Sequence, residues 1–357
     1  MYRKTLARLP IAVVTLLTAV VTLAGPASAV PVLPGSGPVP ANYETQAFSS
    51  GSGDIADDAA IWVNTADPAR SVVIGSKKAS SDGGLAVYDL AGDQIQFLSA
   101  GELNNVDIRS NVFGGKVFLT ATNRTNNSLQ FFFLDPATRT LTTAGSTPVG
   151  FEPYGGCLYV SVTDGQMYAF VTNRNSPYDF DQYRLSASGS TVSGTKVRDM
   201  QTSTLSEGCV ASDPVGQSVF LSEEDKGVYL YSAEPTGGTS RSTVARVGTN
   251  GLTADAEGLA IARDRTTGAA YLIVSSQGSN NEKVYDTATP FTFRKTFNVA
   301  ASGSVDAATG TDGLDVTRAN LGPLYPNGLL VVHDTNNTGG SASNFKYVDA
   351  GLVLGKY

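Results

Sequence analysis

Short apolar runs, bounded by Gly, Asn, Asp and Ser, occupy most of the 357-residue chain. Helical periodicity is nearly absent, so the pattern predicts β-strands. One class of run begins with polar residues and turns apolar, as residues 57–62 do. It recurs six times at a spacing of about 50 residues. The polar starts are residues 57–58, 104–105, 154–156, 207–208, 255–258 and 312–313.

Two further classes of run follow each of these. The second goes from apolar to polar, as in residues 72–78, and the third is mostly aromatic, as in residues 131–133. Six repeats of a small antiparallel meander predict an all-β fold, a six-bladed β-propeller. A β-sandwich or two β domains are the alternatives, although sandwiches show a less regular long-range spacing. We expect residues 43–48 to supply the outer strand of the last blade and close the ring.

The repeat gathers polar residues on one face of the ring. In an antiparallel hairpin the start of one strand lies beside the end of the next. We therefore expect the polar starts and ends to meet there, and no comparable set on the opposite face. This face holds Asp57, Asp58, Lys77, Lys78, Arg124, Arg174, Glu207, Glu223, Glu224, Asp255, Glu257, Gln277, Asp306, Asp312 and Asp334.

Crowded carboxylates repel one another unless a cation is bound. Oxygen ligands without imidazole or thiolate favour hard cations, and Ca²⁺ tolerates irregular loop geometry best. The pattern thus predicts several Ca²⁺ ions, with a solvated acidic rim as the alternative. Lys77, Lys78, Arg124 and Arg174 share one point of the repeat on neighbouring blades. Singly each is typical of a solvated surface, but together they indicate a phosphate-rich polyanion.

Composition excludes several classes of function. The single histidine, His333, argues against zinc, two-metal and histidine phosphatase sites. No Gly-x-Ser-x-Gly elbow with a usable histidine is present, and neither cysteine has an arginine six positions later. The net charge of −7 argues against nucleic-acid binding.

The N-terminus is typical of a secretory signal peptide. A basic head, an apolar run over residues 11–23 and a small-residue cleavage site at residues 27–29 occur in that order. We predict a signal peptide at 1–29, a loose leader at 30–42 and a propeller domain at 43–357. The mature protein would be extracellular and monomeric, with no membrane association. An uncleaved anchor is the alternative, although the run is short for a membrane span.

Cys157 and Cys209 are the only cysteines, and an even pair in a secreted protein predicts a disulfide. They occupy the same point of adjacent repeats. Two buried free thiols are the alternative.

The chain resembles the β-propeller phytase family, in particular its calcium-dependent 3-phytases. Residues 54–62 and 104–109 resemble its two signature stretches, and the match extends in order over roughly residues 45–350. Further similar stretches are residues 84–88, 207–210, 255–259, 275–278, 311–316, 321–323 and 344–346.

The resemblance implies calcium-dependent release of phosphate from phytate, and it assigns roles to residues. Asp57, Glu207, Glu224 and Asp306 would be catalytic. The catalytic Ca²⁺ ligands would be Asp57, Glu207, Glu224, Asp255, Glu257, Gln277 and Asp306. The phosphate contacts would be Lys77, Lys78, Arg124, Tyr154 and Arg174. The structural Ca²⁺ ligands would be Asp58, Ala59 and Val106 (both through carbonyls), Asp312, Asp334 and Asn336.

Three positions depart from the family pattern. Ala59 replaces a proline, Arg174 stands where a lysine is common, and Gly310 stands where an aspartate is frequent. We expect a cation-activated water to attack phosphorus without a covalent intermediate. Lys77 and Arg124 would neutralise the reacting phosphate. Lys78 and Arg174 would hold a second one. A calcium-dependent propeller lactonase and a non-catalytic binding module remain the rival functions.

Overall fold

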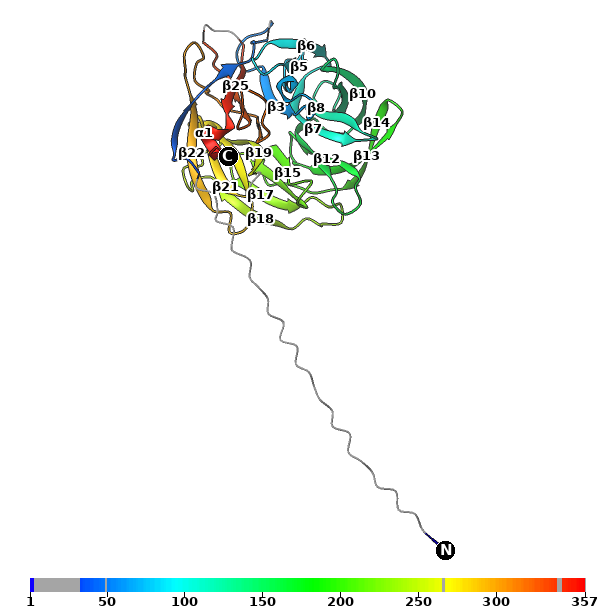
Figure 1. Ribbon diagram of the computed structural model, residues 1–357. Coiled ribbons are helices and arrows are strands. Elements are labelled where there is room, and N and C mark those ends of the chain that lie inside the picture. Colours follow the sequence, from blue (N-terminus) through cyan, green and yellow to red (C-terminus); the bar gives the residue numbers. More distant parts are fainter. Residues whose placement is uncertain (3–32, 49, 265–266, 339–341, 357) are drawn as a thin grey trace.

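The computed structural model describes residues 1–2, 33–48, 50–264, 267–338 and 342–356. Their strands form six sheets arranged in a ring, which confirms the predicted six-bladed β-propeller (Figure 1). Nearly all of the predicted signal peptide, residues 3–29, lies outside the described residues. None of the described helices has the length and apolarity needed to cross a membrane.

Each blade is an antiparallel meander that starts with the strand nearest the channel. Blades one to three are β3 (Ala56–Trp62), β4 (Val72–Lys77), β5 (Gly84–Tyr88) and β6 (Gln94–Ser99); β7 (Leu103–Val112), β8 (Lys116–Asn123), β9 (Ser128–Asp135) and β10 (Thr140–Pro148); and β11 (Pro153–Val160), β12 (Met167–Asn173), β13 (Phe180–Ser188) and β14 (Thr191–Arg198). Blades four to six are β15 (Ser206–Ala211), β16 (Ser218–Glu223), β17 (Gly227–Ser232) and β18 (Arg241–Arg246); β19 (Ala256–Arg263), β20 (Ala270–Ser276), β21 (Asn281–Asp286) and β22 (Phe293–Ala300); and β23 (Leu314–Thr317), β24 (Leu329–Asp334) and β25 (Asn344–Asp349). The helices are η1 (Pro68–Arg70), η2 (Gln277–Ser279) and α1 (Ala350–Leu354).

The core is divided among the blade interfaces. Within the described residues, a separate cluster of buried apolar side chains fills each of the six interfaces. β4 and β12 are buried along their whole length. Their apolar residues are therefore continuous, because both faces of the blade are covered.

The N-terminal segment closes the ring. β2 (Tyr43–Glu44) pairs with β25 as the outer strand of blade six, as predicted from the sequence. β1 (Gly37–Pro40) pairs in parallel with β22 on the outer edge of blade five. That strand lies inside the segment predicted to be a loose leader, so these four leader residues are part of the sheet structure.

A register shift recurs near the start of the inner strand in blades one to five. Such a bulge leaves residues unpaired and re-aims their side chains. The second bulge residue is Gly155, Gly208 or Gly258 in blades three to five. A Cβ on Gly208 would lie 2.1 Å from the carbonyl oxygen of Glu257 in the next blade. Glycine is therefore required for the close approach of neighbouring inner strands.

Cys157 on β11 and Cys209 on β15 form a disulfide between adjacent blades, which confirms that prediction. On the opposite face, a cavity of about 530 Å³ is lined by charged side chains of both signs, including Arg109, Asp213 and Arg263. Arg109 is paired with Asp213 at 2.8 Å, so ion pairs between the blades balance part of this charge.

Candidate functional site

In blades one to five the bulge, and in blade six the turn before β23, places one residue at the same point of the repeat. These residues are Asp57, Asn104, Tyr154, Glu207, Glu257 and Asp312. Three groups of possible metal ligands occur among the described residues, each with ligand atoms within 4.8 Å of one another. They are Asp57, Glu207 and Asp312; Glu207, Glu224 and Glu257; and Asp54, Asp312 and His333. Glu207 and Asp312 each belong to two groups, so the groups form a continuous row of positions that a cation could occupy.

Burial and mutual repulsion make these carboxyl groups hard to ionise. Burial, with a further contribution from Asp312, raises the pKa of Glu207 to about 8. Burial, with Asp255 next, raises the pKa of Glu224 to about 7. The pKa values of Asp57 and Glu257 are also raised, chiefly by burial. Such a cluster needs bound positive charge to ionise at neutral pH.

Several oxygens of the cluster have no partner. Asp57 Oδ2, Glu224 Oε1 and Glu257 Oε2 are buried without a hydrogen bond within the described residues. A buried acceptor left unpaired costs free energy, and a bound cation would remove that cost. A set made of carboxylate oxygens alone fits a hard divalent cation. The acidic residues predicted from the sequence therefore fit a metal site.

Lys78 is the cation that this cluster already contains. Its Nζ lies 3.0 Å from Asp57 Oδ1, 3.1 Å from Asp54 Oδ2 and 3.0 Å from Asp312 Oδ2. Burial lowers the pKa of Lys78, but the three carboxylates outweigh burial and raise the pKa overall. The side chain is therefore charged beside the row of cation positions.

Two polar side chains lie against the central carboxylate. Tyr154 is close to Glu207 and Glu224, and its pKa is raised by burial and then by Glu207. Asn104 Nδ2 donates to Glu207 Oε1 at 2.5 Å. Sequence analysis did not select Asn104 as a site residue. Its place in the repeat, equivalent to that of Asp57 and Glu207, was the available signal.

Arg124 and Arg174 lie next to each other on blades two and three, as predicted. Arg124 Nε and Arg174 Nη1 are 3.1 and 2.8 Å from the same oxygen of Glu152. The Arg174 guanidinium lies 5.9 Å from the centre of the Tyr154 ring. Glu152, which sequence analysis missed, holds the two arginines together beside the acidic cluster. Arg174 is exposed and can meet an anionic ligand.

Asp255 and Gln277 lie beside the cluster, since the Asp255 carboxylate raises the pKa of Glu224. The backbone N–H of Gln277 donates to the Asp255 carbonyl at 3.0 Å. Deeper in the channel, the N–H of Val106 donates to Asp58 Oδ2 at 3.1 Å. A small cavity there is lined by Asp58, Ala59 and Val106 among others. Asp58, Ala59 and Val106 therefore lie near one another, as they must if they bind the same structural Ca²⁺ ion.

Other predicted residues have partners outside the three groups. Lys77 is buried, donates to Ser50 at 2.8 Å and pairs with Asp82 at 2.8 Å. Asp306 pairs with the buried Lys346, which also contacts Glu44.

Lys346 Nζ also lies 3.1 Å from Asp334 Oδ2. Asn336, two residues further on, donates from Nδ2 to Thr309 Oγ1 at 3.0 Å. None of the three groups within the described residues contains Asp306. Asp306 instead pairs with Lys346, and its place among the catalytic Ca²⁺ ligands stays a prediction.

The fold and the site together define a β-propeller protein with a row of possible divalent-cation positions and a pair of arginines beside it. The sequence model of the family described as Phytase matches residues 5–353. The chain belongs to this family and is a phytase hydrolase. It is similar to a "3-phytase" of Bacillus subtilis (strain 168), with 36% identity over 324 residues, 87% of this chain and 83% of that protein.

Similarity to solved structures concerns the fold alone. A luciferin-regenerating enzyme shares 12% sequence identity, with a TM-score of 0.52 over 85% of this chain and 94% of that one.

Proposed function

We propose that the chain is a secreted, calcium-dependent phytase that releases phosphate from myo-inositol hexakisphosphate. Membership of the phytase family supports the substrate. The observation that carries the calcium dependence is the row of buried carboxylates, whose unpartnered oxygens need a divalent cation. The ligand set around Glu207 contains only oxygen, which favours Ca²⁺ over zinc.

Asp57, Glu207, Glu224, Glu257 and Asp312 would hold the ions of this row. Asp255 and Gln277, which lie beside Glu224, would complete the shell. Bound ions would supply Lewis acidity there, lowering the pKa of a bound water and neutralising charge on phosphate.

The chain's own residues would bind and orient the substrate. Arg124 and Arg174, held together by Glu152, offer two planar donor groups to one phosphate or to two neighbouring ones. Lys78 would contribute a point charge nearer the carboxylates, and the Tyr154 hydroxyl would keep Glu207 and Glu224 in place. We leave Lys77 out of this set because Asp82 neutralises it in a buried position.

Phosphate release from phytate, measured with Ca²⁺ and then with an excess of chelator, tests the proposal. We expect release with Ca²⁺, loss with chelator, and recovery when Ca²⁺ but not Mg²⁺ is restored. The same samples should be given a lactone substrate. Lactone opening without phosphate release would support the lactonase instead, and neither activity would support a binding module.

Secretion is the remaining part of the proposal. The basic head, apolar run and cleavage site of residues 1–29 support it, as does the disulfide between Cys157 and Cys209. N-terminal sequencing of protein recovered from the culture medium should find a chain that begins near Val30. A chain that keeps residues 1–29 and stays with the membrane would contradict this part alone.

A further inference from the structure

His333 is the only histidine of the chain, and its surroundings are unusual. It lies on β24, and its side chain is fully buried. Neither Nδ1 nor Nε2 has a hydrogen-bond partner within the described residues. Leaving both nitrogens of a buried imidazole unpaired costs free energy. A ligand for at least one of them would remove that cost.

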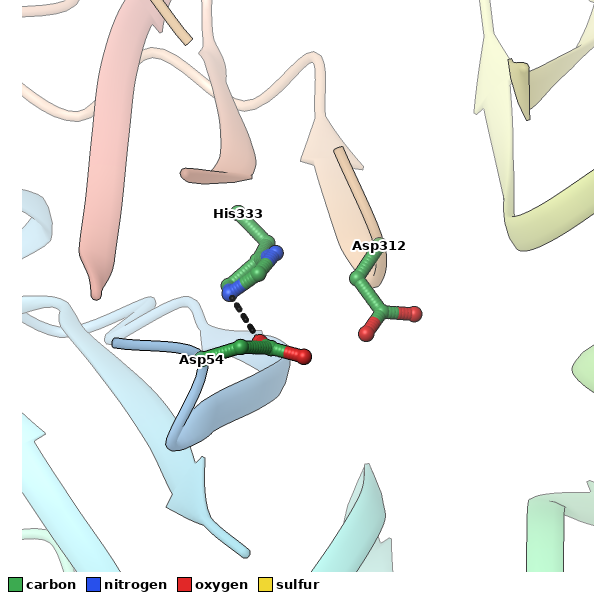
Figure 2. A group of neighbouring side chains, drawn as sticks. All are labelled: Asp54, Asp312 and His333. Carbon is green, nitrogen blue, oxygen red and sulfur yellow. Dashed lines mark ion pairs between the residues drawn. The ribbon is translucent and has the colours of Figure 1, made fainter. Parts of the chain in front are cut away.

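The imidazole points at two carboxylates. Its Nε2 lies 3.6 Å from Asp54 Oδ1, with the Asp312 carboxylate beside both (Figure 2). One ligand atom from each of the three residues lies within 4.8 Å of the other two. Asp54 precedes β3 in blade one, whereas Asp312 and His333 belong to blade six. The three meet only because the first and last blades adjoin.

We propose that His333, Asp54 and Asp312 form a binding site for a first-row divalent transition metal ion, such as Mn²⁺, Co²⁺ or Zn²⁺. One imidazole nitrogen and two carboxylate oxygens are a ligand set that these ions favour, whereas Ca²⁺ takes oxygen ligands. Asp54 is partly exposed, which leaves an entry path. This site goes beyond the proposed phytase activity, whose carboxylate cluster needs no imidazole.

Lys78 shares two of the proposed ligands. Its Nζ contacts Oδ2 of Asp54 and Oδ2 of Asp312, while Oδ1 of Asp54 faces His333. The ion and the ammonium group therefore compete for the same pair of carboxylates. Removing the ammonium group should strengthen metal binding through His333, which a purely structural histidine does not predict.

Titration of Co²⁺ or Zn²⁺ into untagged protein saturated with Ca²⁺ tests the site, because Ca²⁺ then fills the group of Glu207, Glu224 and Glu257, which shares no residue with it. We expect one ion per chain by calorimetry, and a Co²⁺ absorption band that requires the imidazole. The variant H333Q should bind at least about tenfold more weakly. D54N should do the same, and K78M should bind more tightly. In the NMR spectrum, the ring-proton signals of His333, the chain's one histidine, should broaden when Mn²⁺ is added.

D286N is the matched control. Asp286 pairs with Arg294 at 2.6 Å on blade five, so this variant should bind like the wild type. Melting curves with Ca²⁺ establish that each variant is folded. Unchanged affinity in both H333Q and D54N, or no binding by the wild type, would overturn the proposal. None of these readouts involves phytate, so the metal site is judged separately from the phytase activity, which phosphate release measures.

Discussion

Glu207 is the carboxylate on which most contacts of the site converge. Asn104 donates to it, Tyr154 lies close to it, and it belongs to two of the three groups of possible metal ligands. Its removal should therefore disturb the chemistry more than the fold.

Replacing Glu207 with Gln should abolish phosphate release, because one ligand shared by two cation positions is lost. Most of the calcium-induced rise in melting temperature should remain, since Asp58 and the group around Asp334 are untouched. Phosphate assays and melting curves with and without Ca²⁺ check both expectations. Normal turnover, or loss of the whole thermal shift, would contradict this assignment.

The raised pKa of Glu207 also predicts a pH dependence. In chelator, the folded protein keeps a proton up to about pH 8 that the unfolded chain releases near 4.5. The contribution of Glu207 to stability is therefore present at low pH and is lost as the pH rises from about 4.5 to about 8. Without metal, E207Q should melt above the wild type at pH 8.5 and level with it at pH 4.5. A constant difference in melting temperature would argue against the raised pKa.

At the scale of the element, the inner-strand bulge is the feature that forms the site. It leaves five residues outside the regular backbone pairing of the strands: Asp57, Asn104, Tyr154, Glu207 and Glu257. The glycines that follow three of them allow the next strand to approach. The positions of the possible metal ligands therefore depend on how closely neighbouring inner strands approach.

Replacing Gly208 with Ala should destabilise the fold and weaken activity together. The new Cβ would lie 2.1 Å from the Glu257 carbonyl oxygen, so β15 and β19 would have to separate. Overpacking of this kind costs about 1–3 kcal/mol. G35A is the control, since a Cβ on Gly35 meets nothing within 4 Å. Denaturant unfolding measures both variants, and equal stability would contradict the requirement for glycine.

At the scale of the whole molecule, charge concentrates where the ring closes. Asp58 lies on blade one, and Asp312 and Asp334 lie at the ends of blade-six strands. Removal of Arg3, Lys4 and Arg8 with the signal peptide would change the net charge from −7 to about −10. Bound cations should therefore stabilise the closed ring as well as serve catalysis.

We expect a tight class of Ca²⁺ sites that controls melting and a weaker class that controls turnover. Each site adds about 2.7 kcal/mol at a hundredfold excess of Ca²⁺ over its dissociation constant. Replacing Asp58 with Asn should reduce the calcium-induced rise in melting temperature and leave phosphate release largely intact at saturating Ca²⁺. Calorimetry with a single class of sites would refute the division.

The repeating pattern was sufficient to predict the fold and much of the site. Six polar starts at regular spacing predicted six blades, and their common position predicted that Asp57, Glu207 and Glu257 would meet. It also predicted the disulfide between Cys157 and Cys209, because equivalent positions on adjacent inner strands lie close together. Such features depend on local strand periodicity, which the sequence records directly.

Only the tertiary structure decided which residues outside the repeat positions meet. Asp306 pairs with Lys346, and the buried Lys77 pairs with Asp82. His333 faces Asp54, although the two are far apart in the sequence, because ring closure joins blade six to blade one. Periodicity predicts where a residue lies within its own blade. Contacts between side chains of different blades depend on how the blades pack, which no local pattern contains.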